Sequence, residues 1–150
     1  MPPVTPDPAA DAPFRPRRGR VVPQVVAVTF VAVFTAVAVG MGVLGGWSPS
    51  DQVVLVVFAL VVGGFVWRYS QIRAVPGPDG LTVRNLVVTR TVGWDEVEAV
   101  RFVDGDPWPT LMLEDGDDVA VMAVQRVDGP HGRAEAERLV RLVEGRRTAS

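Results

Sequence analysis

The N-terminal half of the chain holds two long apolar runs separated by a short polar turn. No charged residue lies between Arg20 and Asp51, and residues 25–44 are twenty consecutive uncharged positions. As a helix, which rises about 1.5 Å per residue, this run spans roughly 30 Å, the thickness of a bilayer's hydrocarbon core. Residues 52–69 form a second, shorter run whose end residues can reach the headgroups. Because backbone in lipid must satisfy its own hydrogen bonds, the pattern predicts a two-helix transmembrane hairpin over residues 21–69.

Small residues mark where the two predicted helices can approach each other. Gly42 and Gly46 lie at the end of the first run, and Gly63-Gly64 interrupts the second. Small side chains allow close packing of helices in lipid. Residues 40–45 also match the dinucleotide-binding fingerprint, but that fingerprint works only as a strand-to-helix turn, and here it ends a membrane helix. We therefore predict a role in helix packing and no cofactor site.

The distribution of arginine around the hairpin predicts its orientation. Four arginines precede the first apolar run and two follow the second, whereas the turn between them holds a single aspartate. The six are Arg15, Arg17, Arg18, Arg20, Arg68 and Arg73. Positive residues stay on the cytoplasmic side of a membrane, so we expect a multi-pass protein of the cell membrane with both termini in the cytoplasm.

A cleaved signal peptide is the main alternative to a retained first helix. Residues 36–38, Ala-Val-Ala, offer a small-residue cleavage pattern. The apolar run continues past that point, however, and the second run follows at once, which favours retention. Arg17 and Arg18 resemble a twin-arginine signal only loosely, since the surrounding residues of that motif are missing.

The segment before the hairpin has the composition of a disordered tail. Residues 1–16 contain six prolines and few residues that could form a core. We therefore predict a disordered, Pro- and Arg-rich cytoplasmic tail over residues 1–20.

After the hairpin the hydrophobic pattern shortens and begins to alternate, as it does in strands. The Asp-Gly pair within residues 114–118 marks a hairpin turn, and residues 132–145 form an amphipathic helix with a glycine stop. The predicted strands are residues 81–83, 86–91, 97–103, 110–113 and 119–124. Together they predict a small, mainly-β barrel or bent sandwich over residues 70–145, capped by the C-terminal helix and followed by a tail, residues 146–150.

Composition removes several classes of function. The chain has no cysteine, which excludes disulfides, thiolate metal sites and a cysteine nucleophile. From residue 69 onward there are ten arginines against fourteen acidic residues, an excess of four negative charges. Basic contacts to phosphate supply much of the affinity for nucleic acid, so we expect no nucleic-acid partner.

Four short motifs after the hairpin occur in a recognisable order. They are Gly-Leu-Thr-Val-Arg-Asn at residues 80–85, Val-Gly-Trp-Asp-Glu-Val at 92–97, Leu-x-Leu-x-Asp-Gly at 111–116, and the Ala-, Glu- and Leu-containing helix. With the preceding hairpin, this arrangement resembles the bacterial PH-like domain family typified by actinobacterial low molecular weight protein antigen 6. The resemblance covers about residues 69–144. It implies a seven-stranded bent barrel closed by a C-terminal helix, no catalytic residues, and a packing role for Trp94.

Few residues suggest chemistry. The acidic cluster at residues 114–118 lacks the spacing of a calcium loop, so we interpret it as a solvated turn and predict no metal site. His131 is the only histidine and has no nucleophile near it in the sequence, which favours an exposed position at the start of the last helix. We expect neither catalytic residues nor enzymatic activity.

Three residues are candidates for a partner interface. Trp108 lies between two prolines in a stiff turn, where an exposed indole would serve as an anchor, although packing over a barrel end is the commoner role. Arg84 and Arg90 are the basic residues nearest the first hairpin of the domain, and we expect them to pair with neighbouring acids. Phosphoinositide binding by PH domains needs a basic pocket, and the Pro-Gly-Pro-Asp-Gly turn at residues 76–80 departs from that pattern.

These observations predict a membrane-anchored interaction or scaffold module that recruits a protein partner at the cytoplasmic face. The hairpin would confine the domain to the bilayer surface and raise its effective concentration there. The alternative is a domain that binds lipid or a small ligand at the membrane surface.

Overall fold

The computed structural model describes residues 9–17 and 21–149. The chain divides into two compact units. One is the helical segment Arg18–Gln71, and the other combines Met1–Arg17 with Ile72–Ser150. The second unit is therefore built from chain segments on both sides of the first.

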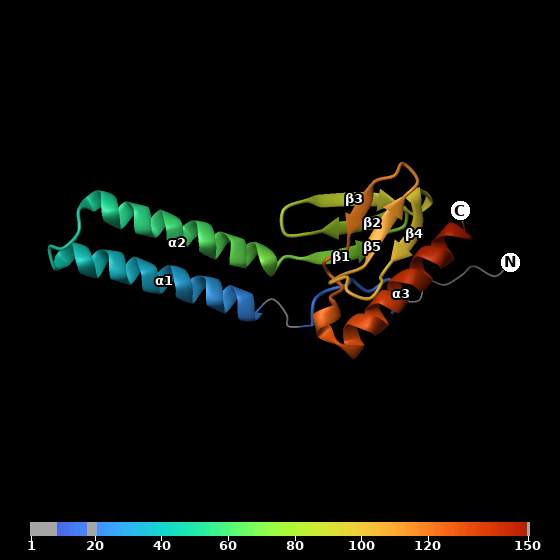
Figure 1. Ribbon diagram of the computed structural model, residues 1–150, viewed down its shortest axis with the longest axis horizontal. Coiled ribbons are helices and arrows are strands. Elements are labelled where there is room, and N and C mark those ends of the chain that lie inside the picture. The colour runs from blue at the N-terminus through green and yellow to red at the C-terminus, as the bar shows by residue number, and fades with distance from the viewer. Residues whose placement is uncertain (1–8, 18–20, 150) are drawn as a thin grey trace. The chain divides into compact units, whose positions relative to one another are not determined.

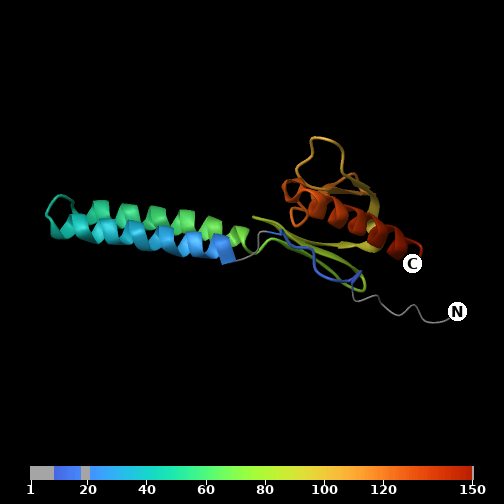
Figure 2. The ribbon, with the colours of Figure 1, turned by 90° about the horizontal axis from the view of Figure 1, so that it is seen from below.

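Two long helices make up the first unit. Helix α1 comprises Val21–Val43 and helix α2 comprises Pro49–Tyr69, and they run side by side as a hairpin (Figures 1 and 2). Both are long and apolar enough to cross a bilayer. Most of their large apolar side chains are exposed, whereas the core helix of a soluble protein buries its apolar stripe. The boundaries agree with the predicted runs to within a few residues.

The turn between the helices is organised by the start of α2. The Ser48 hydroxyl accepts a hydrogen bond from the Asp51 backbone N–H, at 3.3 Å, and the Asp51 carboxylate accepts one from the Ser48 N–H, at 3.0 Å. This reciprocal capping satisfies two of the backbone donors that every helix start leaves open. Pro49 takes the first helical position, where its missing N–H costs nothing.

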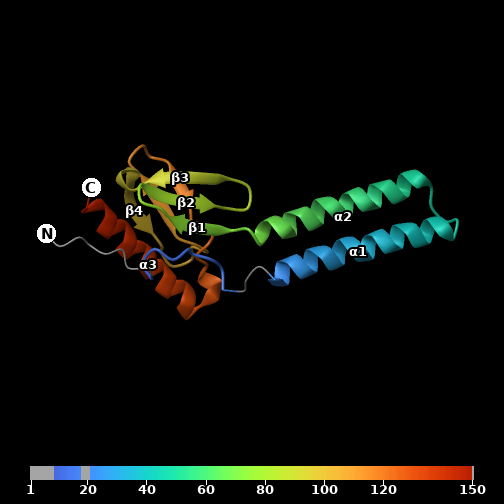
Figure 3. The ribbon, with the colours of Figure 1, turned by 180° about the vertical axis from the view of Figure 1, so that it is seen from behind.

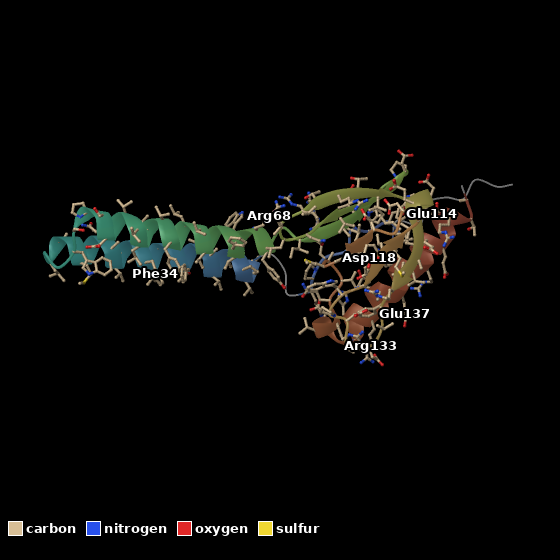
Figure 4. All side chains as sticks on the ribbon, turned by 45° about the horizontal axis from the view of Figure 1, so that its top comes forward. Phe34, Arg68, Glu114, Asp118, Arg133 and Glu137 are labelled. Carbon is tan, nitrogen blue, oxygen red and sulfur yellow. The ribbon has the colours of Figure 1, made fainter. Side chains whose placement is uncertain are left out.

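The helices pack through two of the predicted glycines, Gly42 and Gly63, and a group of phenylalanines. A Cβ atom at Gly42 would lie 2.5 Å from the side-chain amide of Gln52 in α2. A Cβ atom at Gly63 would lie 2.5 Å from Cγ2 of Val31, so this close approach requires glycine. The neighbouring Gly64 faces open space. Phe34 of α1, labelled in Figure 4, stacks on Phe30 with ring centroids 4.3 Å apart. It also lies 6.1 Å from Phe58 of α2.

The second unit contains two antiparallel three-stranded sheets and a C-terminal helix. The first sheet has the order β1-β2-β3, and the second β4-β5-β6. The strands are β1 (Arg73–Pro76), β2 (Gly80–Arg84), β3 (Thr89–Gly93), β4 (Val97–Arg101), β5 (Thr110–Leu113) and β6 (Asp118–Ala120). Helix α3 (Pro130–Arg147) packs against β4 and against the short 3-10 helices η1 (Trp94–Glu96) and η2 (Arg126–Asp128). The fold is consistent with the PH-like domain that the resemblance implied.

Three predicted boundaries are wrong. The run 86–88 is a turn rather than the start of a strand, because Arg84 pairs with Thr89 and the Asn85 N–H donates to the Val88 carbonyl. Strand β6 ends at residue 120, after which the apolar run 121–124 turns into the core. Helix α3 continues through Gly145 to residue 147, so residues 146 and 147 are not part of a tail.

Trp94 lies in the core, as expected. Its side chain is 3% exposed, and its indole N–H donates to the Gly77 carbonyl at 3.0 Å. The two sheets are joined by Asn85, whose side-chain amide donates to the Ala120 carbonyl at 2.7 Å and accepts from the Met122 N–H at 3.3 Å. A partly buried polar side chain bonded on both sides in this way helps to fix how the sheets meet.

The prediction of a disordered tail over residues 1–20 is wrong for residues 9–17, and residues 1–8 and 18–20 lie outside the described residues. Phe14 is 0% exposed and belongs to the hydrophobic core. Its backbone forms an antiparallel bridge with Ala74, through N–H···O=C bonds of 2.8 and 3.1 Å. Figure 3 shows this segment, coloured blue, beside β1. The described residues thus contain six strands, and the outer edge of β1 pairs with the Phe14 segment rather than with a seventh strand.

Helix α3 holds this N-terminal segment, which we call the strap (residues 9–17), in place. The Arg138 guanidinium lies 3.7 Å from the centre of the Phe14 ring. It donates to the carbonyls of Ala9, Ala10 and Ala12 at 2.8–3.2 Å. A second contact joins Arg146 to Asp11, at 2.6 Å. Charge-assisted bonds to several carbonyls compensate for the strap's lack of regular secondary structure.

Candidate functional site

A groove runs between strand β4 and helix α3. Its volume is about 700 Å³, within the range of ordinary ligand sites. Val100 and Phe102 contribute apolar side chains from β4 and the residue that follows it, and Ala136 and Val140 contribute theirs from α3. Ala136 belongs to the core, and Val100 and Phe102 pack against it, so the floor of the groove is continuous with the core of the domain.

Charged side chains form the rim of this groove. The lining includes three arginines and two acids, Arg126, Arg133, Arg141, Asp104 and Glu137. The groove therefore has an excess of positive charge, although the domain as a whole is acidic. Figure 4 shows Arg133 and Glu137 on the same side of α3, as their spacing of four residues requires.

The three arginines differ in how firmly they are held. Arg126 lies 4.3 Å from the centre of the Phe102 ring and donates to the carbonyls of Val103 and Asp106 at 2.5 and 2.6 Å. Arg141 lies 3.9 Å from Glu137, in an exposed pair of the kind that contributes little to stability. Arg133 forms no ion pair among the described residues. Two guanidinium groups on the α3 side are therefore available to an acidic ligand.

The predicted interface residues Arg84 and Arg90 lie on adjacent strands, close to the β2–β3 turn. Arg90 pairs with Asp117 at 3.1 Å and lies 4.0 Å from Asp115, which confirms the expected pairing with acids. The prediction is wrong for Arg84, which forms no ion pair in the described part of the chain. Its Nε atom is buried there without a hydrogen-bond partner.

The turn between these two arginines carries exposed apolar side chains. Val87 is 75% exposed and Val88 is 60% exposed. We call residues 85–88 the tip. Sequence reasoning assigned this apolar run to a strand, and only the hairpin register shows that it projects as a turn.

Trp108 is partly exposed and does not complete a site with the two arginines. It lies in the β4–β5 loop, and no hydrogen bond, ion pair or ring contact joins it to Arg84 or Arg90 among the described residues. The adjacent Pro109 is fully buried, and its carbonyl accepts from the Val121 N–H at 2.8 Å. The stiff turn therefore closes one end of the second sheet.

The two remaining candidates for chemistry lie apart from the groove. His131 is the second residue of α3, is partly exposed, and is not among the groove's lining residues. In the acidic hairpin, labelled at Glu114 and Asp118 in Figure 4, the Leu113 N–H donates to the Asp117 carbonyl and Gly116 adopts a φ of +86°. This is a tight turn with exposed acids, as predicted, and no cluster of three potential metal ligands occurs in residues 9–17 and 21–149.

The groove was not foreseen from the sequence. Its floor is formed by a strand and by a helix roughly thirty residues later in the chain, so no local sequence pattern predicts it. The one available signal was Phe102, an apolar residue near the end of the predicted strand 97–103, followed by a turn with two acids.

Comparisons with known proteins agree with this architecture. Residues 72–142 match the model of the bacterial PH domain family. An uncharacterised protein of Mycobacterium tuberculosis is 40% identical over 82 residues, which cover 55% of this chain and 53% of the relative. Low molecular weight protein antigen 6 of the same organism is 36% identical over 61 residues, covering 41% of this chain and 54% of the relative.

These matches cover only part of this chain and part of each relative. The chain spans about half the length of the curated relatives it matches. No solved structure matches the chain with significance. The family match begins at the residue before β1 and ends within α3, so it includes both sheets and every lining residue of the groove. Residues 72–142 of this chain belong to the bacterial PH domain family.

Proposed function

We propose that the chain is a membrane-anchored interaction module, whose two helices cross the cell membrane and whose PH domain recruits a protein partner at the cytoplasmic face. The observation that carries the proposal is the strap. Residues 9–17 precede α1 and residues 72–149 follow α2, yet both fold into one unit around Phe14. Segments that share one hydrophobic core lie on the same side of a bilayer, which requires an even number of crossings between them.

The same observation argues against removal of the first helix. Cleavage near Ala38 would separate Phe14 from the domain and take away a fully buried core residue. Retention of both helices keeps the strap attached. The arginines that flank the hairpin then favour the cytoplasmic side for the whole unit.

Binding rather than catalysis is supported by the character of the groove. Its floor is apolar, its rim holds charged side chains of both signs, and one face of it is a strand edge. These are properties of a surface that recognises another macromolecule. Confinement to the membrane would raise the local concentration of the domain toward partners at the same surface.

Topology is tested by cysteine labelling, since the chain contains no cysteine. Single cysteines replace Ser48, in the turn between the helices, and Val127, which is 74% exposed in the domain. In intact cells a membrane-impermeant maleimide should label Ser48→Cys and spare Val127→Cys until the membrane is permeabilised. Labelling of Val127→Cys in intact cells would place the domain outside and overturn the cytoplasmic assignment.

Recruitment is tested by photo-crosslinking in cells. A benzophenone amino acid replaces Arg141 in the groove, Thr91 on β3, or Val88 at the tip. A discrete protein adduct from at least one of these positions is expected. Absence of protein adducts from all three would contradict the recruiting function.

The tip favours a second candidate function, contact with the lipid surface. Two exposed valines between two arginines can insert apolar groups among acyl chains while the guanidinium groups meet anionic headgroups. An environment-sensitive dye on Val88→Cys, in the full chain reconstituted in nanodiscs, would report insertion. A blue shift that requires phosphatidylglycerol supports lipid contact, and identical emission in neutral and anionic nanodiscs would exclude it.

A further inference from the structure

Strand β4 is an open edge of the second sheet. The sheet has the order β4-β5-β6, so β4 pairs with β5 on one side only. The corresponding outer edge in the first sheet, on β1, is paired with the strap. An unpaired edge presents a row of backbone N–H and C=O groups and is a template for another strand.

Arginine side chains occupy both ends of this edge and leave its centre free. Arg147 donates to the Glu98 carbonyl at 2.6 Å, and Arg126 donates to the Val103 carbonyl. Residues 99–102, between these two points, receive no side-chain hydrogen bond in the part of the chain that the structure describes. Alternate residues of an edge strand direct their N–H and C=O groups outward, so this stretch offers roughly two to four main-chain bonds.

The groove lies beside the same edge. Val100 and Phe102 are two residues apart in the chain, so their side chains point to one face, and both line the groove. A strand added to β4 would therefore place every second side chain over an apolar floor that Ala136 and Val140 complete from α3. Side-chain pockets along a strand edge are how added strands acquire specificity.

The charge of the groove selects the chemistry of the added strand. Arg133 and Arg141 lie eight residues apart on one side of α3, with Glu137 midway between them, and Arg133 has no acidic partner among the described residues. The surrounding domain has an excess of four negative charges. Acidic side chains would find guanidinium partners here and repulsion over much of the remaining surface, which favours this groove over other positions.

From this placement we infer that the groove between β4 and α3 binds an acidic, extended peptide segment of a protein partner, which adds to β4 as a further strand. The inference rests on the proposed recruiting function and specifies its docking site and ligand. A lipid headgroup could meet the arginines but would leave the backbone groups of residues 99–102 unused. The strand edge is what distinguishes a peptide ligand.

The direct test measures peptide binding to the full chain in nanodiscs of neutral lipid by fluorescence anisotropy. The probe is a labelled seven-residue peptide of alternating Glu and Val. Two matched peptides separate charge from main-chain pairing. One has Lys in place of Glu, and the other keeps the Glu-Val sequence but is N-methylated at alternate residues, which removes backbone donors and retains charge.

We expect the Glu-Val peptide to bind and each matched peptide to bind at least tenfold more weakly. The double variant Arg133→Glu, Arg141→Glu should lose at least tenfold in affinity. Arg15→Glu makes a charge change of the same kind outside the groove and should leave affinity unchanged. Each arginine involved is exposed at the surface, so the variants are expected to retain the fold, which near-ultraviolet circular dichroism checks.

Other outcomes overturn the inference in distinguishable ways. Equal affinity for the N-methylated peptide would mean a charged groove without strand addition. Protein adducts from Thr91 or Val88 in cells, combined with no peptide binding, would leave recruitment standing and remove this docking site. Anisotropy unchanged by any peptide, with dye on Arg141→Cys responding to anionic lipid, would make the groove a lipid site. A concentration-dependent dimer that Arg133→Glu abolishes would assign the edge to a second copy of the chain.

Discussion

At the scale of single residues, the fold of the PH domain depends on one phenylalanine that lies far from the rest in sequence. Phe14 is fully buried and pairs with Ala74 across sixty residues of intervening chain. Its surroundings in the sequence are proline-rich and carry no periodicity. The sequence therefore predicts the packing role of Trp94, which lies inside a recognisable motif. It does not predict the burial of Phe14, which depends on a contact with a segment sixty residues later.

Replacing Phe14 by alanine should destabilise the domain by about 3–5 kcal/mol, because a large buried ring is lost and a cavity remains. Chemical denaturation of the full chain in detergent, followed by tryptophan fluorescence, to which buried Trp94 contributes, measures this loss. Arg15→Ala is the matched control, since Arg15 is exposed on the same segment, and it should change stability by less than about 0.5 kcal/mol. Equal stability of both variants would contradict the described core.

Arg138 makes a separate contribution through its carbonyl contacts. Its guanidinium is only 16% exposed and bonds three strap carbonyls as well as Glu135. Arg138→Met keeps most of the apolar stem but removes these bonds, and should cost about 1–3 kcal/mol. We expect limited proteolysis to cut the strap faster in this variant than in Arg141→Met, whose side chain has no contact with the strap. Equal cleavage rates would show that Arg138 does not hold the strap.

At the scale of elements, periodicity and length predicted the helices well and the strand ends poorly. The apolar runs, the Asp-Gly turn and the amphipathic stripe of α3 are each encoded by a local sequence pattern, and the folded chain forms the element that the pattern predicts. The tip at residues 85–88 shows the opposite case. Its valines have high strand propensity, yet pairing of Arg84 with Thr89 makes them the turn, because register is decided by the partner strand.

The helix hairpin offers a prediction at this scale. Gly63 contacts Val31 of α1 closely, whereas Gly64 faces open space. Gly63→Leu should therefore push the helices apart by roughly 2 Å, the spread of interaxial distances that side-chain size allows, and Gly64→Leu should not. Spin labels on Val22→Cys and Phe65→Cys, both exposed positions, would report the separation in nanodiscs. The same shift in both variants would argue against packing at Gly63.

At the scale of the whole molecule, the helical hairpin is an insertion within the folded domain rather than an appendage before it. The unit that follows the helices is completed by the segment that precedes them. Composition could not reveal this, since a Pro- and Arg-rich segment before a membrane helix is typical of a tail. The groove escaped sequence reasoning for the same reason, because it exists only once β4 and α3 are packed together.

A truncated domain should show the importance of the strap directly. Residues 72–149 alone lack Phe14 and should be less stable than a chain that joins residues 9–17 to residues 72–149 by a flexible linker of about twenty residues. The difference should be about 3–5 kcal/mol, close to that of Phe14→Ala. Hydrogen exchange at the edge of β1 is the sensitive readout, since Ala74 donates its N–H to Phe14. Full protection of Ala74 in the shorter chain would contradict the role of the strap.

Because the strap precedes the helices in the chain, the domain can complete its core only after both helices have been synthesised. During translation Phe14 emerges first, and its partner Ala74 is made only after both helices. A chain with one helix inserted would hold the two residues on opposite sides of the membrane, and its domain would keep an open edge on β1. Such a chain is a substrate for proteases, which act on incompletely folded segments. Under the proposed topology, only a chain with both helices inserted brings Phe14 and Ala74 to the same side and closes the core, so folding of the domain would act as a checkpoint on membrane insertion.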